Sequence, residues 1–143
     1  MRNCSGFTLI EILVVVLIIT ILATIVGVNV IPSLGKANVA AATAQIREFK
    51  TALKLYAMDN GSVPTQQQGL AALCRRPETP PVPPRYPEEG YLDGRIVPPD
   101  PWGREYVYLA PAADGSAYEI ISYGSDGEPG GEGAAADISS LGL

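Results

Sequence analysis

The sequence predicts an α+β protein in which a long N-terminal helix packs on a small antiparallel β-sheet. Three observations predict this fold. A nearly uncharged apolar run covers residues 7–31. A stripe of apolar residues at helical spacing follows it within residues 33–58. Two short alternating segments near the C-terminus, residues 105–109 and 117–123, are rich in aromatic and β-branched residues and are typical of strands.

The composition excludes several classes of function. The chain has 143 residues, which suits one domain with a short appendage, and its net charge of −5 argues against nucleic-acid binding. It contains no histidine, so Ser-His-Asp and Cys-His catalysis and imidazole metal sites are excluded. Its two cysteines are too few for a disulfide framework or a zinc–cysteine cluster. No other catalytic arrangement is recognisable, so we expect no enzymatic activity.

The apolar run is long enough to cross a bilayer as a helix. From Ile12 to Val28 only two threonines and one glycine interrupt it, and a hydrocarbon core of roughly 30 Å needs about 20 apolar residues. A cleaved secretory signal is one alternative, but its apolar region is only about 7–15 residues long. A plain signal anchor explains the length. Neither alternative explains Glu11, the single charge in the run.

The next segment is predicted to be a soluble amphipathic helix. Its apolar residues follow a 4-3-4-3 spacing that places them on one face; they are Ala42, Ile46, Phe49, Leu53 and Tyr56. Residues 59–61, Asp-Asn-Gly, form a stop signal because Asn and Gly tolerate the left-handed conformation that ends a helix. Gly27, Pro32 and Gly35 are weak points at which the two helical segments could bend or unwind.

The remaining elements are short. Residues 64–73 indicate a turn and a short helix, and residues 77–101 hold nine of the thirteen prolines and are expected to be irregular. Residues 111–116 contain Asp-Gly and join the two predicted strands as a hairpin. Asp100 and Pro101 start a turn, and Trp102 is expected to cover the proline-rich stretch.

The C-terminal loop is rich in glycine and acid. Four carboxylates fall within twelve residues and repel one another: Asp126, Glu128, Glu132 and Asp137. Glycines also make such a loop costly to order. Bound Ca²⁺ would solve both problems, since it takes six to eight oxygens from carboxylates and carbonyls. The spacing is not that of an EF-hand, and a solvated acidic loop remains the alternative.

The start of the chain resembles a family. Residues 6–11, Gly-Phe-Thr-Leu-Ile-Glu, are similar to the signal of type IV pilins and pseudopilins. The resemblance implies that a prepilin peptidase cleaves after Gly6 and that Phe7 becomes N-methylphenylalanine. It also implies a partner for Glu11. An ionised carboxylate in hydrocarbon costs roughly 2.5 kcal/mol or more, and the new α-amine on Phe7 of a neighbouring subunit would neutralise it and fix the register of a filament.

The rest of the chain is similar to the major pseudopilins of type II secretion systems. The loop from Ser122 to Ile138 resembles their C-terminal signature, and matching pieces include residues 59–61, 90–92 and 100–103. The resemblance implies one structural Ca²⁺ held by the carboxylate of Asp126 and the carbonyls of Tyr123 and Ser125. Some members carry a second acid where this chain has Gly133, so Glu132 or Asp137 would serve instead.

The cysteines favour pseudopilins over type IV pilins. Many type IV pilins staple the C-terminal loop with two cysteines. Cys4 would leave with the leader, so the mature chain would keep only Cys74, which is expected to be a buried small apolar residue.

The resemblance implies an organisation and a set of partners. Residues 1–6 would be the leader, residues 7–31 a transmembrane and filament-core helix, and residues 32–143 a periplasmic globular domain. The chain would span the inner membrane once and polymerise into a pseudopilus that drives export of folded proteins across the outer membrane. Its partners would be other copies, minor pseudopilins, the peptidase, and an inner-membrane platform with its ATPase, but no nucleic acid. A type IV pilin for adhesion, motility or DNA uptake and a signal-anchored calcium-binding module are the alternatives.

Overall fold

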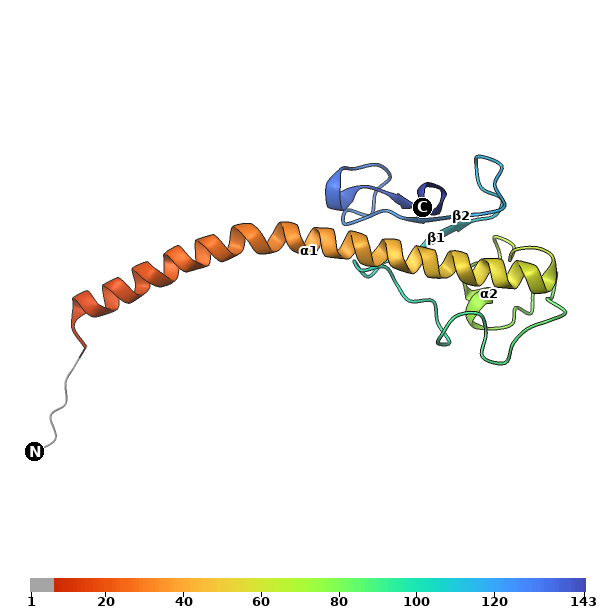
Figure 1. The fold of residues 1–143 in the computed structure, drawn as a ribbon, viewed down its shortest axis with the longest axis horizontal. Coiled ribbons are helices and arrows are strands. Elements are labelled where there is room, and N and C mark those ends of the chain that lie inside the picture. The colour runs from red at the N-terminus through yellow and green to blue at the C-terminus, as the bar shows by residue number, and fades with distance from the viewer. Residues whose placement is uncertain (1–6) are drawn as a thin grey trace, which may run out of the picture. The chain divides into compact units, whose positions relative to one another are not determined.

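The computed structural model describes residues 7–143, and the side chains of all of these except residues 25–33. Two helices, α1 (Leu9–Asn60) and α2 (Ala71–Cys74), precede three strands, β1 (Val107–Leu109), β2 (Glu119–Ser122) and β3 (Ile138–Ser139) (Figure 1). Two 3₁₀ turns, η1 (Gly133–Ala135) and η2 (Ser140–Gly142), flank β3. The chain divides into two compact units: unit 1 ends at Gly35, and unit 2 runs from Lys36 to Leu143. The α+β fold is therefore confirmed.

Unit 1 holds the first half of α1. The helix continues through Gly27 and Pro32, so neither residue ends it. Its large apolar side chains from Phe7 to Leu22 are 45–84% exposed, so they form no core within unit 1. Within the described part of the chain, no helix combines the length and the mean apolar character that crossing a bilayer requires.

The core of unit 2 forms on the predicted stripe of α1. Ala42, Ile46, Phe49 and Leu53 are completely buried, and Tyr56 is nearly so. They pack with Leu73 of α2 and Ile120 of β2, among others. The helix ends at Asn60 and Gly61 follows with a φ of +81°, as the Asp-Asn-Gly signal predicts. The helical spacing therefore located the buried face of α1, and the Asp-Asn-Gly signal located its end.

The sheet is antiparallel with strand order β1-β2-β3. Tyr108 pairs with Ile120 across the hairpin, and Ser122 pairs with Ile138 at the other edge of β2. The hairpin is confirmed, although both strands are shorter than their alternating segments, because only part of each segment finds a partner. Strand β3 was not predicted, since two residues are too few to show an alternation.

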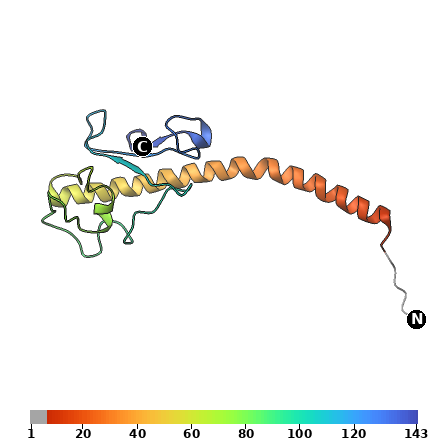
Figure 2. The same cartoon turned by 180° about the vertical axis from the view of Figure 1, so that it is seen from behind.

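The elements of unit 2 lie on two sides of its helix. The sheet and the C-terminal loop lie along one side, and α2 with the irregular segment lies along the other (Figures 1 and 2). The proline-rich residues 77–101 contain no helix or strand, as expected. Aromatic contacts hold them: Tyr91 lies 5.2 Å from Tyr56 and 5.3 Å from Tyr86, measured between ring centroids.

Candidate functional site

The first candidate site is the start of α1, where Glu11 has a local partner. The backbone amide of Glu11 donates to the Oγ1 atom of Thr8 at 3.3 Å. In return, the amide and hydroxyl of Thr8 donate to Oε2 of Glu11 at 3.4 and 3.3 Å. This reciprocal arrangement is a capping box, which satisfies amides that a helix start leaves without partners. The capping box was not predicted from the sequence, although Thr-x-x-Glu before an apolar run is its signature.

The capping box gives Glu11 a role within one chain that does not require a neighbouring subunit. Glu11 is nevertheless exposed, and so are all the large apolar side chains around it. Of the two predicted processing residues, the structure describes only Phe7, which is 80% exposed just before the helix. Gly6 lies outside the described residues. A helix that is apolar all round is normally buried against a partner or lipid. This surface therefore lacks its natural environment in a single copy.

The second candidate site is the C-terminal loop of unit 2, and Arg104 holds its first turn. The guanidinium donates to the carbonyl of Gly124 at 2.7 Å and to that of Ser125 at 3.1 Å. A Cβ on Gly127 would lie only 2.6 Å from Nε of Arg104, so a larger residue there would displace the Arg104 side chain. Arg104 was missed from sequence. Its one signal is that it is, with Arg95, one of two bases after Glu88.

The predicted metal donors lie in this loop, but most of them are engaged. The carbonyl of Tyr123 accepts a hydrogen bond from the amide of Gly127 at 3.1 Å, and that of Ser125 accepts from Arg104. Oδ1 of Asp126 accepts from the amide of Glu128 at 3.2 Å, and Oδ2 of Asp137 accepts from the amide of Gly130 at 2.9 Å. In the described part of the chain, no three acidic, histidine or cysteine side chains gather as a metal-binding group.

The donors fit calcium in kind, because every one of them is an oxygen and calcium prefers hard oxygen ligands. Asp126 and Asp137 are alike in this respect, since a backbone amide engages one of the two carboxylate oxygens in each. The Ser125 carbonyl fits less well, because the cationic guanidinium of Arg104 already donates to it. The side chain of Glu132 is exposed.

A buried carboxylate ties the loop to the sheet. Asp100 is only 4% exposed. Its Oδ1 accepts from the amides of Trp102 and Arg104 at 3.1 and 2.8 Å, which closes the predicted turn. Its Oδ2 accepts from the hydroxyl of Ser122, at the end of β2, at 2.7 Å. Three hydrogen bonds offset the cost of burying this charge, and they position Arg104 against the loop.

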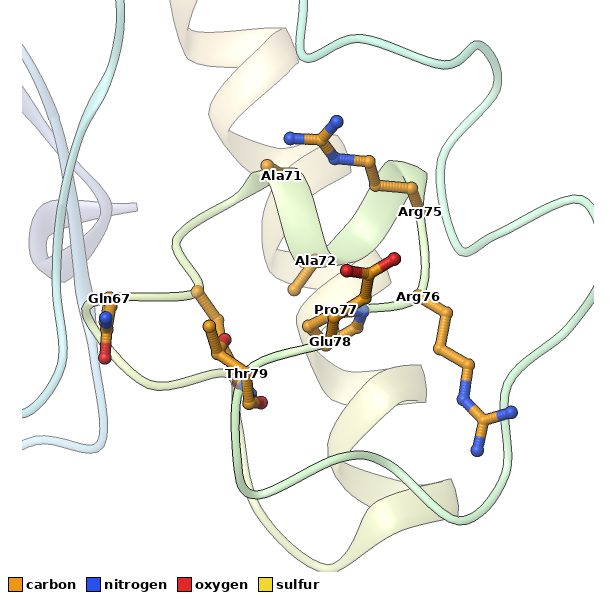
Figure 3. Close-up of a pocket in the computed structure, with 9 residues that line it drawn as sticks. Gln67, Ala71, Ala72, Arg75, Arg76, Pro77, Glu78 and Thr79 are labelled. Atoms are coloured by element: carbon orange, nitrogen blue, oxygen red, sulfur yellow. The ribbon is translucent and has the colours of Figure 1, made fainter.

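A pocket of about 340 Å³ lies beside α2 (Figure 3), but its lining residues form no binding site for a ligand. Arg75 and Arg76 line it, but their side chains extend in different directions, so the two charges do not converge on one ligand. The side-chain amide of Gln68 donates to the backbone carbonyls of Thr79 and Pro81 at 2.7 and 3.0 Å and fixes the wall of the pocket. The pocket is therefore a consequence of how the irregular segment folds back on α2.

Comparison with known proteins decides the family. The family described as type II secretion system (T2SS), protein G, matches residues 29–141, and the prokaryotic N-terminal methylation motif matches residues 1–27. The chain belongs to the protein G family of type II secretion systems. The type II secretion system core protein G of Vibrio cholerae is 44% identical over 138 residues, which cover 96% of this chain and 92% of that protein. The core protein G of Pseudomonas aeruginosa is 44% identical over 137 residues, which cover 96% and 94%.

A solved protein G relative supports the same assignment. The crystal structure of the major pseudopilin from the type 2 secretion system of enterohaemorrhagic Escherichia coli matches with a TM-score of 0.66 and 35% identity, over 80% of this chain and 96% of that one. Membership of the protein G family separates the alternatives that the sequence left open. The chain is grouped with structural pseudopilins and not with type IV pilins, a signal-anchored calcium module or an enzyme family.

Proposed function

We propose that the chain is the major structural subunit of a type II secretion pseudopilus and polymerises through the first half of α1. The supporting observation is the apolar surface from Phe7 to Leu22. Each large apolar side chain in this segment is between 45% and 84% exposed. Burial of apolar area contributes about 25 cal/mol per Å², so packing this surface against identical helices would stabilise a filament strongly. Growth of the filament would then push folded proteins across the outer membrane.

The same surface supports the location and the partners. Before assembly, the apolar helix would anchor the subunit in the inner membrane as a single span, with unit 2 in the periplasm. A prepilin peptidase would cleave after Gly6 and Phe7 would be methylated, in keeping with the matched methylation motif. Minor pseudopilins, an inner-membrane platform and, through it, an ATPase would assemble the subunits.

Glu11 provides the test, because its capping and its charge can be separated. Glu11→Gln keeps an acceptor for the capping box and removes the charge, whereas Glu11→Leu removes both. Thr8→Ala removes the cap and keeps the charge. If Glu11 pairs with the α-amine of a neighbouring Phe7, both Glu11 variants should lower the yield of sheared filaments about tenfold or more, since each lost contact of 1.4 kcal/mol is a factor of ten. Thr8→Ala should assemble, and membrane levels should be equal in all variants.

Filaments of Glu11→Gln at the wild-type yield would show that the charge has no role in assembly and that the capping box is the function of Glu11. Electron microscopy of the sheared fraction, with an immunoblot of the membrane fraction, distinguishes these outcomes.

The proposal extends to Ca²⁺ in the C-terminal loop. The carboxylate of Asp126 and the carbonyls of Tyr123 and Ser125 would hold the ion, with Glu132 or Asp137 as the second acid. The free carboxylate oxygen of Asp126 supports this assignment. The ion would offset the mutual repulsion of the acids and the entropy of ordering the glycines.

Removal of calcium is therefore expected to lower the melting temperature. A chelator should destabilise the purified full-length chain by several degrees, and Asp126→Asn should abolish the response, while Glu128→Gln should keep it. The effect should weaken in acid, because the ligands must be ionised. A thermal melt that is the same with calcium and with chelator would refute the metal site and leave the filament proposal intact.

A further inference from the structure

We propose that the acidic loop of one subunit, residues 126–137, contacts an exposed basic face of α1 in a second copy of this chain. The basic face consists of Arg47, Thr51, Lys54, Leu55 and Met58. The inference rests on the proposed polymer, since it concerns a contact between its subunits. It concerns unit 2 and is separate from the packing of the apolar helices.

The basic face belongs to a helical segment with an excess of basic residues. From Lys36 to Asp59 the chain has four basic residues and two acids, Glu48 and Asp59. Lys50 is used within the chain, where its Nζ donates to the carbonyls of Ser140 and Leu143. Arg47 and Lys54 are exposed. They are seven residues apart, two helical turns, and so project from one side of α1.

Apolar side chains accompany these charges. Leu55 is 49% exposed and Met58 is 81% exposed, one and four residues after Lys54. A face with two cations beside two exposed large apolar residues is typical of a protein interface, where a partner covers the apolar part and matches the charge.

The acidic loop has the complementary composition. It carries four carboxylates and no base, and all four acidic residues are exposed. Asp126 and Asp137 accept hydrogen bonds from backbone amides, which leave their negative charges uncompensated. One bound divalent ion would remove half of the four charges, and Glu128, which is not among the expected metal donors, would still face solvent.

The two surfaces lie at different places along the helix of one subunit. Gly133, Ala136 and Asp137 line a hollow together with Val39 and Thr43 of α1. Arg47 follows Thr43 by one helical turn, and Lys54 follows Thr43 by eleven positions, about 16 Å at the helical rise. Arg47 and Lys54 are both exposed, so the loop does not cover them in its own chain. When each copy uses its two patches on different neighbours, the contact is head-to-tail and propagates along a polymer.

Cross-linking tests the contact directly. A full-length chain with Cys74→Ala, Lys54→Cys and Glu128→Cys should give a ladder of oligomers when its filaments are treated with a short bismaleimide. Either introduced cysteine alone should give no ladder. Lys54→Cys with Glu88→Cys is the matched control, because Glu88 is also an exposed acid but lies outside the loop.

Charge reversal gives a second measurement that needs no cysteine. Lys54→Glu and Glu128→Lys should each lower filament yield about tenfold, and combining the two should restore at least half of it. Arg85→Glu is the control and should have no effect. Filaments that form normally without the cross-link, or a double variant with no recovery, overturn the contact alone. A wild-type chain that forms no filaments overturns the proposed function as well.

Discussion

The hydroxyl of Tyr86 is a buried polar atom without a hydrogen-bond partner, among the residues that the structure describes. Burial raises the pKa of Tyr86 to about 12, with the neighbouring Cys74 and Tyr91 adding to the rise. Tyr108 is different: its hydroxyl is buried but donates to the carbonyl of Pro64 at 2.8 Å. Two tyrosines of unit 2 with buried hydroxyls thus differ in whether the hydroxyl is paired.

This difference predicts opposite effects of one chemical change. Tyr86→Phe removes an unpaired polar atom and should raise the free energy of unfolding by about 1 kcal/mol. Tyr108→Phe leaves the Pro64 carbonyl without its donor and should lower it by about 1–2 kcal/mol. Thermal unfolding of the two purified variants beside the wild type measures both, and a loss of stability in Tyr86→Phe would mean that its hydroxyl has a partner.

Single residues also mark how far the sequence predicts the site. The spacing of Phe49 and its neighbours is local, so the buried face of α1 could be read from the sequence. Arg104 could not be, because its guanidinium reaches carbonyls about twenty positions away, and such a contact depends on where the sheet places the loop. The capping box of Thr8 and Glu11 could have been predicted, since its two residues are only three positions apart. The family resemblance implied a different role for the same carboxylate.

At the scale of elements, the C-terminal loop is ordered by close backbone approaches. Gly124 has a φ of +59°, and a Cβ there would lie 2.8 Å from the carbonyl oxygen of Ala134. Gly133 has nearly the same backbone conformation, with a φ of +64°, but a Cβ there would meet nothing within 4 Å. The two glycines therefore have similar backbone conformations but differ in the room available for a side chain.

The pair separates packing from conformational strain. Each Gly→Ala change should cost about 1–2 kcal/mol for the left-handed conformation. Gly124→Ala should cost about 1–3 kcal/mol more, because backbone must move to admit the methyl group. Chemical denaturation of both variants gives the difference, and equal losses would show that the segment near Ala134 moves aside freely.

The elements were predicted unequally for a physical reason. Helix α1 and the hairpin carry their own periodicity and turn residues, so the sequence predicted them. Strand β3 exists only because β2 offers a free edge: its two residues pair with Ile121 and Ser122. The metal site stays a prediction, because the choice among Glu132, Asp137 and the carbonyls depends on how the loop closes.

At the scale of the whole molecule, the chain combines a unit with its own core and a helix without one. Unit 2 buries its apolar stripe against α2 and the sheet. Unit 1 leaves its apolar side chains exposed, and a single copy gives them nothing to pack on. Packing against other copies of the chain, as proposed above, would bury this surface.

The mass of the subunit recovered from purified filaments shows whether the chain is processed and polymerises. We expect filaments built from this chain, with each copy beginning at Phe7 and carrying one added methyl group. Copies that keep residues 1–6, or that remain single under conditions in which the secretion system is active, would contradict this expectation.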